Sequence, residues 1–386
     1  MTLQAMILDR ARTWINSGDR VVMATISHIR GSSSQPLTSR MAINAGGAFV
    51  GFVSGGCVEA DVAEHASALF AGDPASGAPG AAPEIPGPAR LLHYRQVQDG
   101  SIEIGLNCEG SIEVLLEPAT SELVDTLSAD KPTIVVTSYV PGEVVEVDRR
   151  VLAPGGAPDG VDPDVVSALQ EVTGDGVPRS VRGSDGRTTL VELVGSPPTL
   201  LIVSASSVAY PLSSLAKTLG YRVVISDPRS DYVTRDLFPD ADELLCIWPR
   251  ELPKHVSFGP RVYVVSLNHE ARFEDDLFSM LAAKASARAA ATGKPVVGYL
   301  GAIGKAKRQT ERVERLTAAG VDLSILPPIH TPIGLDLGGK GAEEVALSVM
   351  AEIQAHRYGR TGGRLKDTRS VHVATADLDT PSADRS

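Results

Sequence analysis

The stretch TLLIVSASSVAYPLSSLAKTLGYRVVISDPR, residues 199–229, decides the fold of the second half of the chain. It contains an apolar strand, a helical segment and a second apolar strand, and the runs RVYVVSLN (261–268) and KPVVGYLG (294–301) follow later. Near-continuous apolar strands separated by helices are typical of a parallel sheet that helices cover on both faces. We therefore predict a Rossmann-like, doubly wound parallel-sheet domain over residues 197–358.

Ligands of a doubly wound sheet bind beyond the carboxyl ends of its strands, so the residues that follow each strand are the first candidates for a site. We expect these cofactor-binding residues to line one crevice: Ser204, Ser206, Asp227, Arg229, His269, Gly301 and Lys305. The dinucleotide fingerprint has glycine where this chain has Ser204 and Ser206, and the two Cβ atoms hinder the close approach of a pyrophosphate. NAD(P) binding and a turn without any ligand are therefore both kept as alternatives. Asp227 lies where such folds hold a ribose hydroxyl, whereas Arg229 could hold a phosphate in a bidentate fork.

Two later segments extend this predicted site. The helix that begins near residue 304 carries Arg308 in its first turn, where it could bind a phosphate, and we expect Arg312 and Arg315 to lie on a solvated face. The proline-rich loop at 327–336 is stiff and could close one wall of the site with three further candidates, which are His330, Gly334 and Asp336.

The first half of the chain has a different pattern. Residues 4–16 and 58–70 carry apolar side chains at helical spacing, whereas VVMATIS (21–27) and AFVGFVS (48–54) are typical of strands. Short alternating runs between residues 91 and 194 predict a largely antiparallel, mixed sheet. The fold class is therefore α/β, with a mixed α/β N-terminal domain followed by the Rossmann-like domain.

Composition sets the predicted boundaries. We place the N-terminal domain at residues 1–196 and expect a flexible insertion at 71–90, because this segment consists almost wholly of Ala, Gly and Pro. The polar residues 359–386 are predicted to form a disordered tail.

Two small-residue loops in the first half are candidate ligand sites. GSSSQP (31–36) follows a predicted strand, and such a loop can direct successive backbone N–H groups at an anion. SGGCVE (54–59) places Cys57 at the start of a helix, where the partial positive charge of the helix end favours a thiolate. The alternative is that Cys57 has no chemical role and is a small residue that fits a tight turn. The candidate residues of the two loops are Gly31, Ser32, Ser33, Ser54, Gly55, Gly56, Cys57 and Glu59.

The other two cysteines differ from each other in their surroundings. Cys108, in GLNCEG (105–110), lies among glycines before an apolar strand and is a second candidate thiolate. Cys246 is flanked by Leu245 and Ile247, so we expect it to be buried and inert. Cys57 and Cys108 lack the four ligands of a structural zinc site, so no dedicated metal site is predicted.

Overall composition excludes several classes of protein. The 386 residues carry a net charge of −11, without the cationic excess on which nucleic-acid binding depends. No apolar run is long enough for a membrane span. Three cysteines cannot form a disulfide framework and no signal-peptide core is evident, so we expect a cytoplasmic protein.

Several of these motifs together resemble those of one known family. GSSSQP, GFVSGGCVEADV (51–62) and GLNCEGSIEVLLEP (105–118) in the first half are similar to motifs of the XdhC/CoxI family. In the second half LNHE, VVGYLGAIGKAKR (296–308) and PPIHTPIGLDLGGKG (327–341) are similar to motifs of the same family. The chain departs from the family pattern at Ser204 and Ser206 and at Glu109, where the family has glycine.

The resemblance implies an accessory chaperone for xanthine dehydrogenase-type molybdenum hydroxylases, without turnover of its own. Such a protein binds the molybdenum cofactor, as molybdopterin or its dinucleotide form, and protects it during sulfuration. A cysteine desulfurase-type sulfurtransferase supplies the sulfur, and the hydroxylase apoenzyme receives the cofactor. By this resemblance Cys57 could contact molybdenum. The alternatives are an NAD(P)-dependent oxidoreductase, or a xanthine dehydrogenase accessory subunit that uses the Rossmann domain, and a scaffold for the two partner enzymes. The scaffold is compatible with the chaperone function, and a homodimer is plausible.

Overall fold

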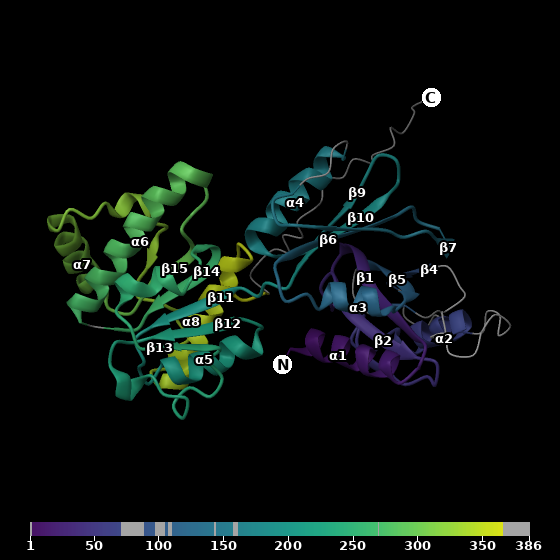
Figure 1. The fold of residues 1–386 in the computed structure, drawn as a ribbon, viewed down its shortest axis with the longest axis horizontal. Helices are drawn as coiled ribbons and strands as arrows, with labels where there is room; N and C mark the ends of the chain where they lie inside the picture. Colours follow the sequence, from purple (N-terminus) through teal and green to yellow (C-terminus); the bar gives the residue numbers. More distant parts are fainter. Residues whose placement is uncertain are drawn as a thin grey trace. The chain divides into compact units, whose positions relative to one another are not determined.

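The computed structural model describes residues 2–70, 89–96, 105–106, 110–142, 144–156, 161–268 and 270–365. The chain forms two compact units, which we call the N-terminal unit, mainly Leu3–Thr173 and Val177–Gly195, and the C-terminal unit, mainly Ser196–Gly362 (Figure 1). Of the predicted insertion, residues 71–88 lie outside the described part, and Ala89 and Arg90 begin a strand.

The elements that precede residue 196 are α1 (Leu3–Asn16), β1 (Val21–Gly31), β2 (Arg40–Asn44), β3 (Phe49–Gly51), α2 (Glu59–Phe70), β4 (Ala89–Arg95), β5 (Gly110–Pro118), α3 (Ser121–Leu127), β6 (Thr133–Tyr139), β7 (Val144–Val145), β8 (Asp148–Leu152), α4 (Pro163–Asp175), β9 (Arg179–Arg182) and β10 (Thr188–Val194).

The strands of the N-terminal unit form two antiparallel sheets rather than the single mixed sheet predicted. The first has the order β3-β2-β1-β5-β4-β7, and the second has the order β8-β6-β10-β9. The segment 144–152 supplies a strand to each, because β7 pairs with β4 and β8 pairs with β6. The helices predicted at 4–16 and 58–70 are confirmed as α1 and α2. The predicted strand 48–54 is shorter than expected, since residues after Gly51 enter the loop that precedes α2.

Ion pairs rather than apolar contacts alone connect these two sheets. Three Arg–Glu pairs have one partner in each sheet, namely Arg40–Glu192, Arg149–Glu117 and Arg182–Glu113. The Arg40 and Glu192 side chains are only 4% and 6% exposed. A buried pair of this kind is costly to break, because removal of one partner leaves an uncompensated charge.

The elements of the C-terminal unit are β11 (Thr199–Val203), α5 (Ala209–Thr218), β12 (Arg222–Ser226), η1 (Ser230–Tyr232), β13 (Glu243–Leu245), η2 (Pro249–Lys254), β14 (Gly259–Ser266), α6 (Ala271–Thr292), β15 (Val297–Ala302), α7 (Ala306–Ala318), η3 (Leu323–Ile325), β16 (Ile329–His330) and α8 (Ala342–Arg357).

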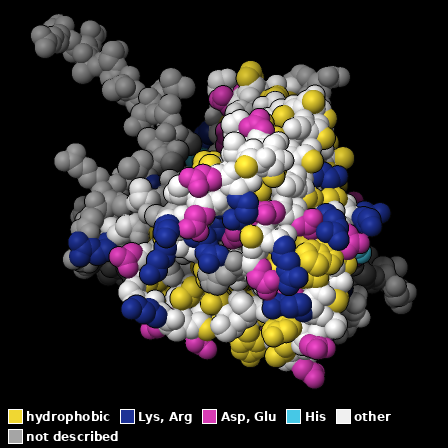
Figure 2. Space-filling view, turned by 90° about the vertical axis from the view of Figure 1, so that its left-hand side faces the viewer, with side chains coloured by type: hydrophobic (Ala, Val, Ile, Leu, Met, Phe, Trp, Pro, Cys, Tyr) yellow, Lys and Arg dark blue, Asp and Glu magenta, His cyan; other side chains and the backbone are white. Residues whose placement is uncertain are grey.

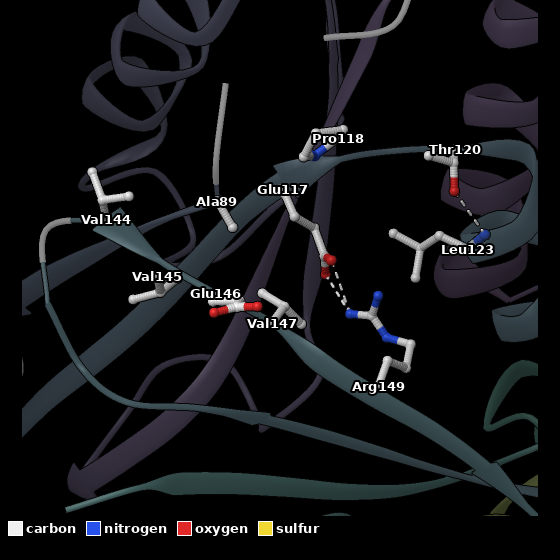
Figure 3. Close-up of a pocket in the computed structure, with 10 residues that line it drawn as sticks. All are labelled: Ala89, Glu117, Pro118, Thr120, Leu123, Val144, Val145, Glu146, Val147 and Arg149. Carbon is white, nitrogen blue, oxygen red and sulfur yellow. Dashed lines mark hydrogen bonds and ion pairs between the residues drawn. The ribbon is translucent and has the colours of Figure 1, made fainter. Parts of the chain in front are cut away.

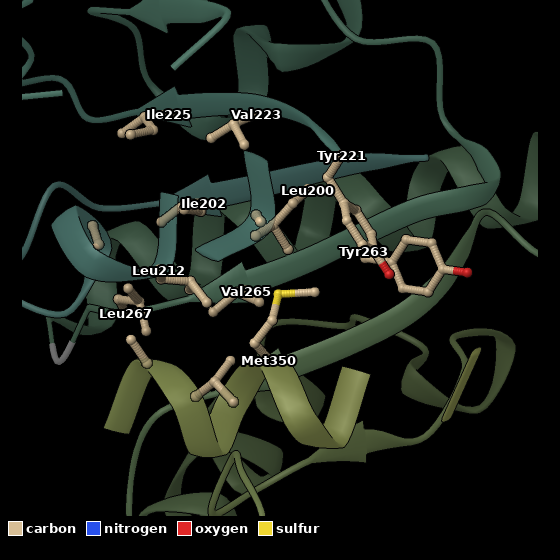
Figure 4. Close-up of a cluster of buried hydrophobic side chains, with 14 of the residues drawn as sticks. Leu200, Ile202, Leu212, Tyr221, Val223, Ile225, Tyr263, Val265, Leu267 and Met350 are labelled. Atoms are coloured by element: carbon tan, nitrogen blue, oxygen red, sulfur yellow. The ribbon is translucent and has the colours of Figure 1, made fainter. Parts of the chain in front are cut away.

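These strands form one parallel sheet, which confirms the predicted doubly wound fold. The order is β13-β12-β11-β14-β15-β16, and each neighbouring pair is parallel. Helices α5 and α8 pack on one face, where Leu212 and Met350 join the core of apolar strand residues (Figure 4). Helices α6 and α7 cover the other face through Leu281 and Leu316 (Figure 1). The carboxyl ends of β11, β12, β14 and β15 therefore meet at one edge, as the sequence predicted.

The polar face predicted for α7 is only partly correct. Figure 2 shows the side of the molecule that bears α7 in Figure 1, with Lys and Arg side chains interspersed among Asp and Glu. Arg312 is nevertheless completely buried and pairs with Glu274 of α6, which is 1% exposed. Arg315 bonds to the other Glu274 oxygen at 3.1 Å and to Asp275 at 2.7 Å. The expectation of a solvated Arg312 was wrong because α6 supplies buried carboxylates that helical periodicity within α7 does not reveal.

Candidate functional site

The loop before α2 is held in place by the side chain of Ser54. Its Oγ accepts hydrogen bonds from the backbone N–H groups of Cys57 at 2.9 Å and Val58 at 3.0 Å. Both amides belong to the loop residues immediately before α2, so these bonds satisfy backbone donors at the entry to the helix. Ser54 thus fixes the backbone on either side of Cys57.

The carboxylate of Glu59, the first residue of α2, lies inside a ring of donors from the same loop. Its two oxygens accept hydrogen bonds at 2.6–3.2 Å from the Ser54 hydroxyl and from the backbone N–H groups of Val53, Ser54, Gly55, Gly56 and Val58. Burial alone would raise the pKa of Glu59. The bonds from the Ser54 hydroxyl and the backbone amides outweigh burial and lower the pKa to about 2.

Cys57 is exposed, whereas Ser54, Val58 and Glu59 are buried. Gly55 and Gly56 have φ values of +83° and +116°, a region that residues with a Cβ rarely adopt, and this geometry lets successive N–H groups converge on Glu59. The sequence predicted a thiolate at Cys57 and cofactor binding by the loop residues that supply most of these amides. In the structure Glu59 occupies them, so what the loop presents is the thiol of Cys57 on a fixed backbone.

The predicted anion loop GSSSQP lies beside the Cys57 loop. The Ser34 hydroxyl donates to the carbonyl of Ser54, and the Ser33 hydroxyl donates to the carbonyl of Gln35 at 2.8 Å. At the start of the loop, Gly31 pairs with Gly110 of β5. A Cβ on Gly110 would lie only 2.1 Å from the carbonyl oxygen of Ser32, which explains the glycine there. The structure thus brings the residues 31–35 and 54–59 together, while Cys108 lies outside the described residues.

At the carboxyl edge of the parallel sheet, Asp227 organises the turns that follow β11 and β12. Its side chain is completely buried and accepts hydrogen bonds from the Ser204 hydroxyl at 3.2 Å and the Ala205 N–H at 3.0 Å. Arg229 donates from its backbone N–H at 3.0 Å and from Nε and Nη2 at 2.9 and 2.7 Å. Burial raises the pKa of Asp227, but these bonds, led by the Arg229 side chain, lower it overall.

These contacts change the interpretation of three predicted residues. Asp227 is enclosed by five donors of its own chain, which leaves no place for a ribose hydroxyl. Ser204 has the left-handed backbone conformation, with φ +87°, that glycine has at this position of the dinucleotide fingerprint. The hydrogen bond from its hydroxyl to Asp227 stabilises this conformation. The Arg229 side chain is 36% exposed, and its guanidinium carbon lies 4.2 Å from the centre of the Tyr232 ring. Ser206 Oγ is buried without a hydrogen-bond partner among the described residues.

The loop 329–336 is held by a residue that the sequence did not single out. Glu352 of α8 accepts hydrogen bonds from the Tyr299 hydroxyl at 2.7 Å and the Gly334 N–H at 2.6 Å, and its other oxygen lies 3.1 Å from His330 Nδ1. Burial and the bond to Glu352 raise the pKa of Tyr299. The available signal was the position of Glu352 beside the apolar stripe of α8, three residues after Val349.

The remaining predicted residues of this edge have separate environments. A Cβ on Gly301 would collide with Ile333, and one on Gly334 would collide with Ser348, so both glycines permit close packing of the loop. Lys305 is exposed at the N-cap of α7, and Asp336 is also exposed. His269 lies outside the described residues.

Cys246 contradicts the prediction of a buried thiol. It is exposed, and its Sγ lies 3.7 Å from the carbonyl oxygen of Pro228. The prediction was wrong because β13 ends at Leu245, so the apolar neighbours of Cys246 do not continue into a buried strand.

The described part of the chain has neither a metal-binding cluster nor a membrane-spanning helix. In it, no three His, Cys, Asp or Glu side chains are arranged to hold a metal ion. None of the helices described is both long and apolar enough to cross a bilayer.

Comparison with known proteins connects both units to one family. The model of the XdhC and CoxI family matches residues 14–76, which contain the two adjacent loops, and the model of the XdhC Rossmann domain matches residues 200–353. The chain belongs to the XdhC and CoxI family. This membership confirms the resemblance that the motifs indicated.

Two curated relatives of this family member match it over most of their length. A Bacillus subtilis (strain 168) protein, named as a probable subunit of xanthine dehydrogenase, is 28% identical over 347 residues, which cover 87% of this chain and 92% of that protein. An Escherichia coli (strain K12) protein named molybdenum cofactor insertion chaperone PaoD is 27% identical over 367 residues, which cover 92% and 91%.

A solved structure shares the fold of this XdhC and CoxI family chain. It is a crystal structure from Bacillus halodurans described as that of a xanthine dehydrogenase, with a TM-score of 0.66 and 21% sequence identity. The match covers 96% of this chain and 98% of that one. At this identity the similarity shows the fold alone.

Proposed function

We propose that this chain is an accessory protein that binds the molybdenum cofactor and delivers it to the apoenzyme of a molybdenum hydroxylase. The observation that carries the proposal is the exposed Cys57 on a backbone fixed by Ser54 and Glu59. A thiolate is a soft ligand suited to a metal–sulfur centre. Membership of the XdhC and CoxI family, together with a relative named as a cofactor insertion chaperone, supports the same function.

In this proposal Cys57 contacts the molybdenum end of the ligand. The fit rests on an accessible sulfur held on a rigid loop, since a flexible thiol would lose conformational entropy on binding. The amides of the loop bind Glu59, so the phosphate of the ligand is held by other groups.

The proposal extends to partners. A cysteine desulfurase-type sulfurtransferase supplies the terminal sulfur while the cofactor is bound, and the hydroxylase apoenzyme then takes the cofactor over. Direct NAD(P) chemistry is a weaker alternative, because Asp227 lacks room for the ribose hydroxyl that it would have to hold.

Retention of cofactor tests the proposal. The purified full chain is loaded with molybdenum cofactor, desalted, and assayed for bound pterin by the fluorescence of its oxidised form. We expect Cys57→Ser to retain at least about tenfold less pterin, as expected for loss of a metal–thiolate bond. Cys246→Ser is the matched control, because Cys246 is also exposed but lies in the other unit, and it should retain the wild-type amount. Equal retention by the two variants would exclude Cys57 as the contact, and a wild-type chain that retains no pterin would refute the function.

A further inference from the structure

A pocket of about 450 Å³ lies in the N-terminal unit where the segment 144–152 passes from one sheet to the other. Its volume is in the usual range for small-molecule sites. It is lined by Ala89, Glu117, Pro118, Thr120, Leu123, Val144, Val145, Glu146, Val147 and Arg149 (Figure 3). It is separate from the Cys57 loop, because Glu117 lies at the far end of β5 from Gly110, the strand residue beside Ser32.

One polar group of the pocket is a fixed donor. Arg149 Nη2 lies 2.7 and 2.9 Å from the two oxygens of Glu117, and Arg149 Nε lies 3.3 Å from the Thr137 hydroxyl. Glu117 is 7% exposed, and burial raises the pKa of its carboxyl although Arg149 opposes this shift. These contacts leave Nη1 of Arg149 without an acceptor among the described residues.

A second polar group of the pocket is the carboxylate of Glu146. Glu146 is exposed, and no hydrogen bond or ion pair holds its side chain in the described part of the chain. The rest of the wall is mainly apolar, with Val144, Val145, Val147 and Leu123 as its largest members. The pocket therefore combines one available cationic donor, one available anionic acceptor and an aliphatic surface.

We propose that this pocket binds a small zwitterion with an aliphatic side chain, of the α-amino-acid class, with its carboxylate on Arg149 and its ammonium group on Glu146. Charges of opposite sign then alternate from Glu117 through Arg149, the ligand carboxylate and the ligand ammonium group to Glu146. The aliphatic side chain buries apolar surface against the valines, and the two charged ends give specificity. This site is independent of the proposed cofactor function.

Calorimetric titration of the purified full chain with L-leucine tests the assignment. Two analogues each lack one charged group: 3-methylbutylamine lacks the carboxylate, and 4-methylpentanoate lacks the ammonium group. We expect leucine to bind at least about tenfold more tightly than either analogue, because each charge-assisted hydrogen bond contributes this much or more. Equal binding of leucine and the amine would overturn the role of Arg149, and equal binding of leucine and the acid would overturn that of Glu146.

Three variants complete the experiment. Glu146→Gln keeps the shape of an exposed side chain and should weaken leucine binding about tenfold or more. Glu122→Gln removes an exposed carboxylate of α3 that does not line the pocket and should leave binding unchanged. Val147→Trp fills the pocket and should abolish binding, while thermal unfolding verifies that the variant is folded. Absence of leucine binding by the wild-type chain, or equal losses in Glu146→Gln and Glu122→Gln, would overturn the proposal.

Discussion

Glu59 in the N-terminal unit and Asp227 in the C-terminal unit are buried carboxylates next to strand-to-helix turns, but they are satisfied in different ways. Glu59 accepts hydrogen bonds from five backbone N–H groups and one hydroxyl, and no ion pair to it occurs in the described residues. Asp227 accepts from a hydroxyl and two backbone N–H groups, and its charge is paired with the Arg229 guanidinium. Glu59 therefore shapes a loop, whereas Asp227 links side chains of two turns.

The two carboxylates therefore leave different net charges near the candidate sites. Backbone dipoles stabilise Glu59 without cancelling its charge, so the Cys57 loop keeps a fixed negative charge beneath an exposed thiol. Arg229 cancels the charge of Asp227, and the edge of the sheet is locally neutral. Substitutions at the two carboxylates should consequently differ in size and in pH dependence.

The largest expected effect is at Glu59. Glu59→Ala leaves the buried backbone N–H groups of Val53 and Ser54 without their acceptor and should reduce the unfolding free energy of the N-terminal unit by about 3 kcal/mol. The chain has two tryptophans, Trp14 and Trp248, one in each unit, so urea titration in a Trp248→Phe background follows the N-terminal unit through Trp14 fluorescence.

Glu64→Ala is the control for that substitution, because Glu64 is an exposed residue of the same helix. It should change the unfolding free energy by less than about 0.5 kcal/mol. Similar losses in the two variants would mean that Glu59 has no special role in the loop.

A smaller effect is expected at Arg229. Arg229→Met keeps the aliphatic part of the side chain but removes two hydrogen bonds to buried Asp227, so the C-terminal unit should lose about 2 kcal/mol. Trp248 fluorescence in a Trp14→Phe background measures it. Arg250→Met, at a residue with a 61% exposed side chain, should have little effect, and a loss as large as that of Arg229→Met would contradict the comparison.

The unfolding free energy of the N-terminal unit at acid pH should report the ionisation of Glu59. Its folded-state pKa of about 2 lies below its ordinary value of about 4.3, so its stabilisation is complete above that value and is lost as the pH falls towards 2. Between pH 5 and pH 3 the N-terminal unit of the wild-type chain should lose about 1.5 kcal/mol more than that of Glu59→Gln, as followed by Trp14. Parallel pH profiles for the two proteins would refute the lowered pKa.

The smallest expected effect is at Ser204. Ser204→Gly relieves the positive φ, which costs a residue with a Cβ about 1 kcal/mol, but it also removes a hydrogen bond of about the same value to Asp227. The unfolding free energy of the C-terminal unit should change by less than about 0.5 kcal/mol. A gain of more than 1 kcal/mol in the Trp248 titration would show that the hydroxyl contributes nothing.

Much of the architecture could be predicted because it depends on local pattern. The apolar runs before Ser204 and Asp227 are continuous, and continuous apolar strands separated by helices require a covered parallel sheet. The crossing of segment 144–152 between two sheets could not be predicted, since alternation identifies strands but not which strand each will join. Arg312 and Cys246 were misjudged for a related reason: their burial depends on α6 and on where β13 ends.

The sequence by itself determined the doubly wound sheet, the family and the position of Cys57 in a glycine-rich turn, because periodicity and motif spacing are carried by neighbouring residues. Only the tertiary structure decided that Glu59 occupies the amides of the Cys57 loop, that Asp227 binds Arg229 instead of facing a ligand, and that Glu352 holds the loop 329–336. Hydrogen-bond partners depend on which donors the fold brings within about 3 Å of an acceptor, and residue spacing along the chain does not specify that distance.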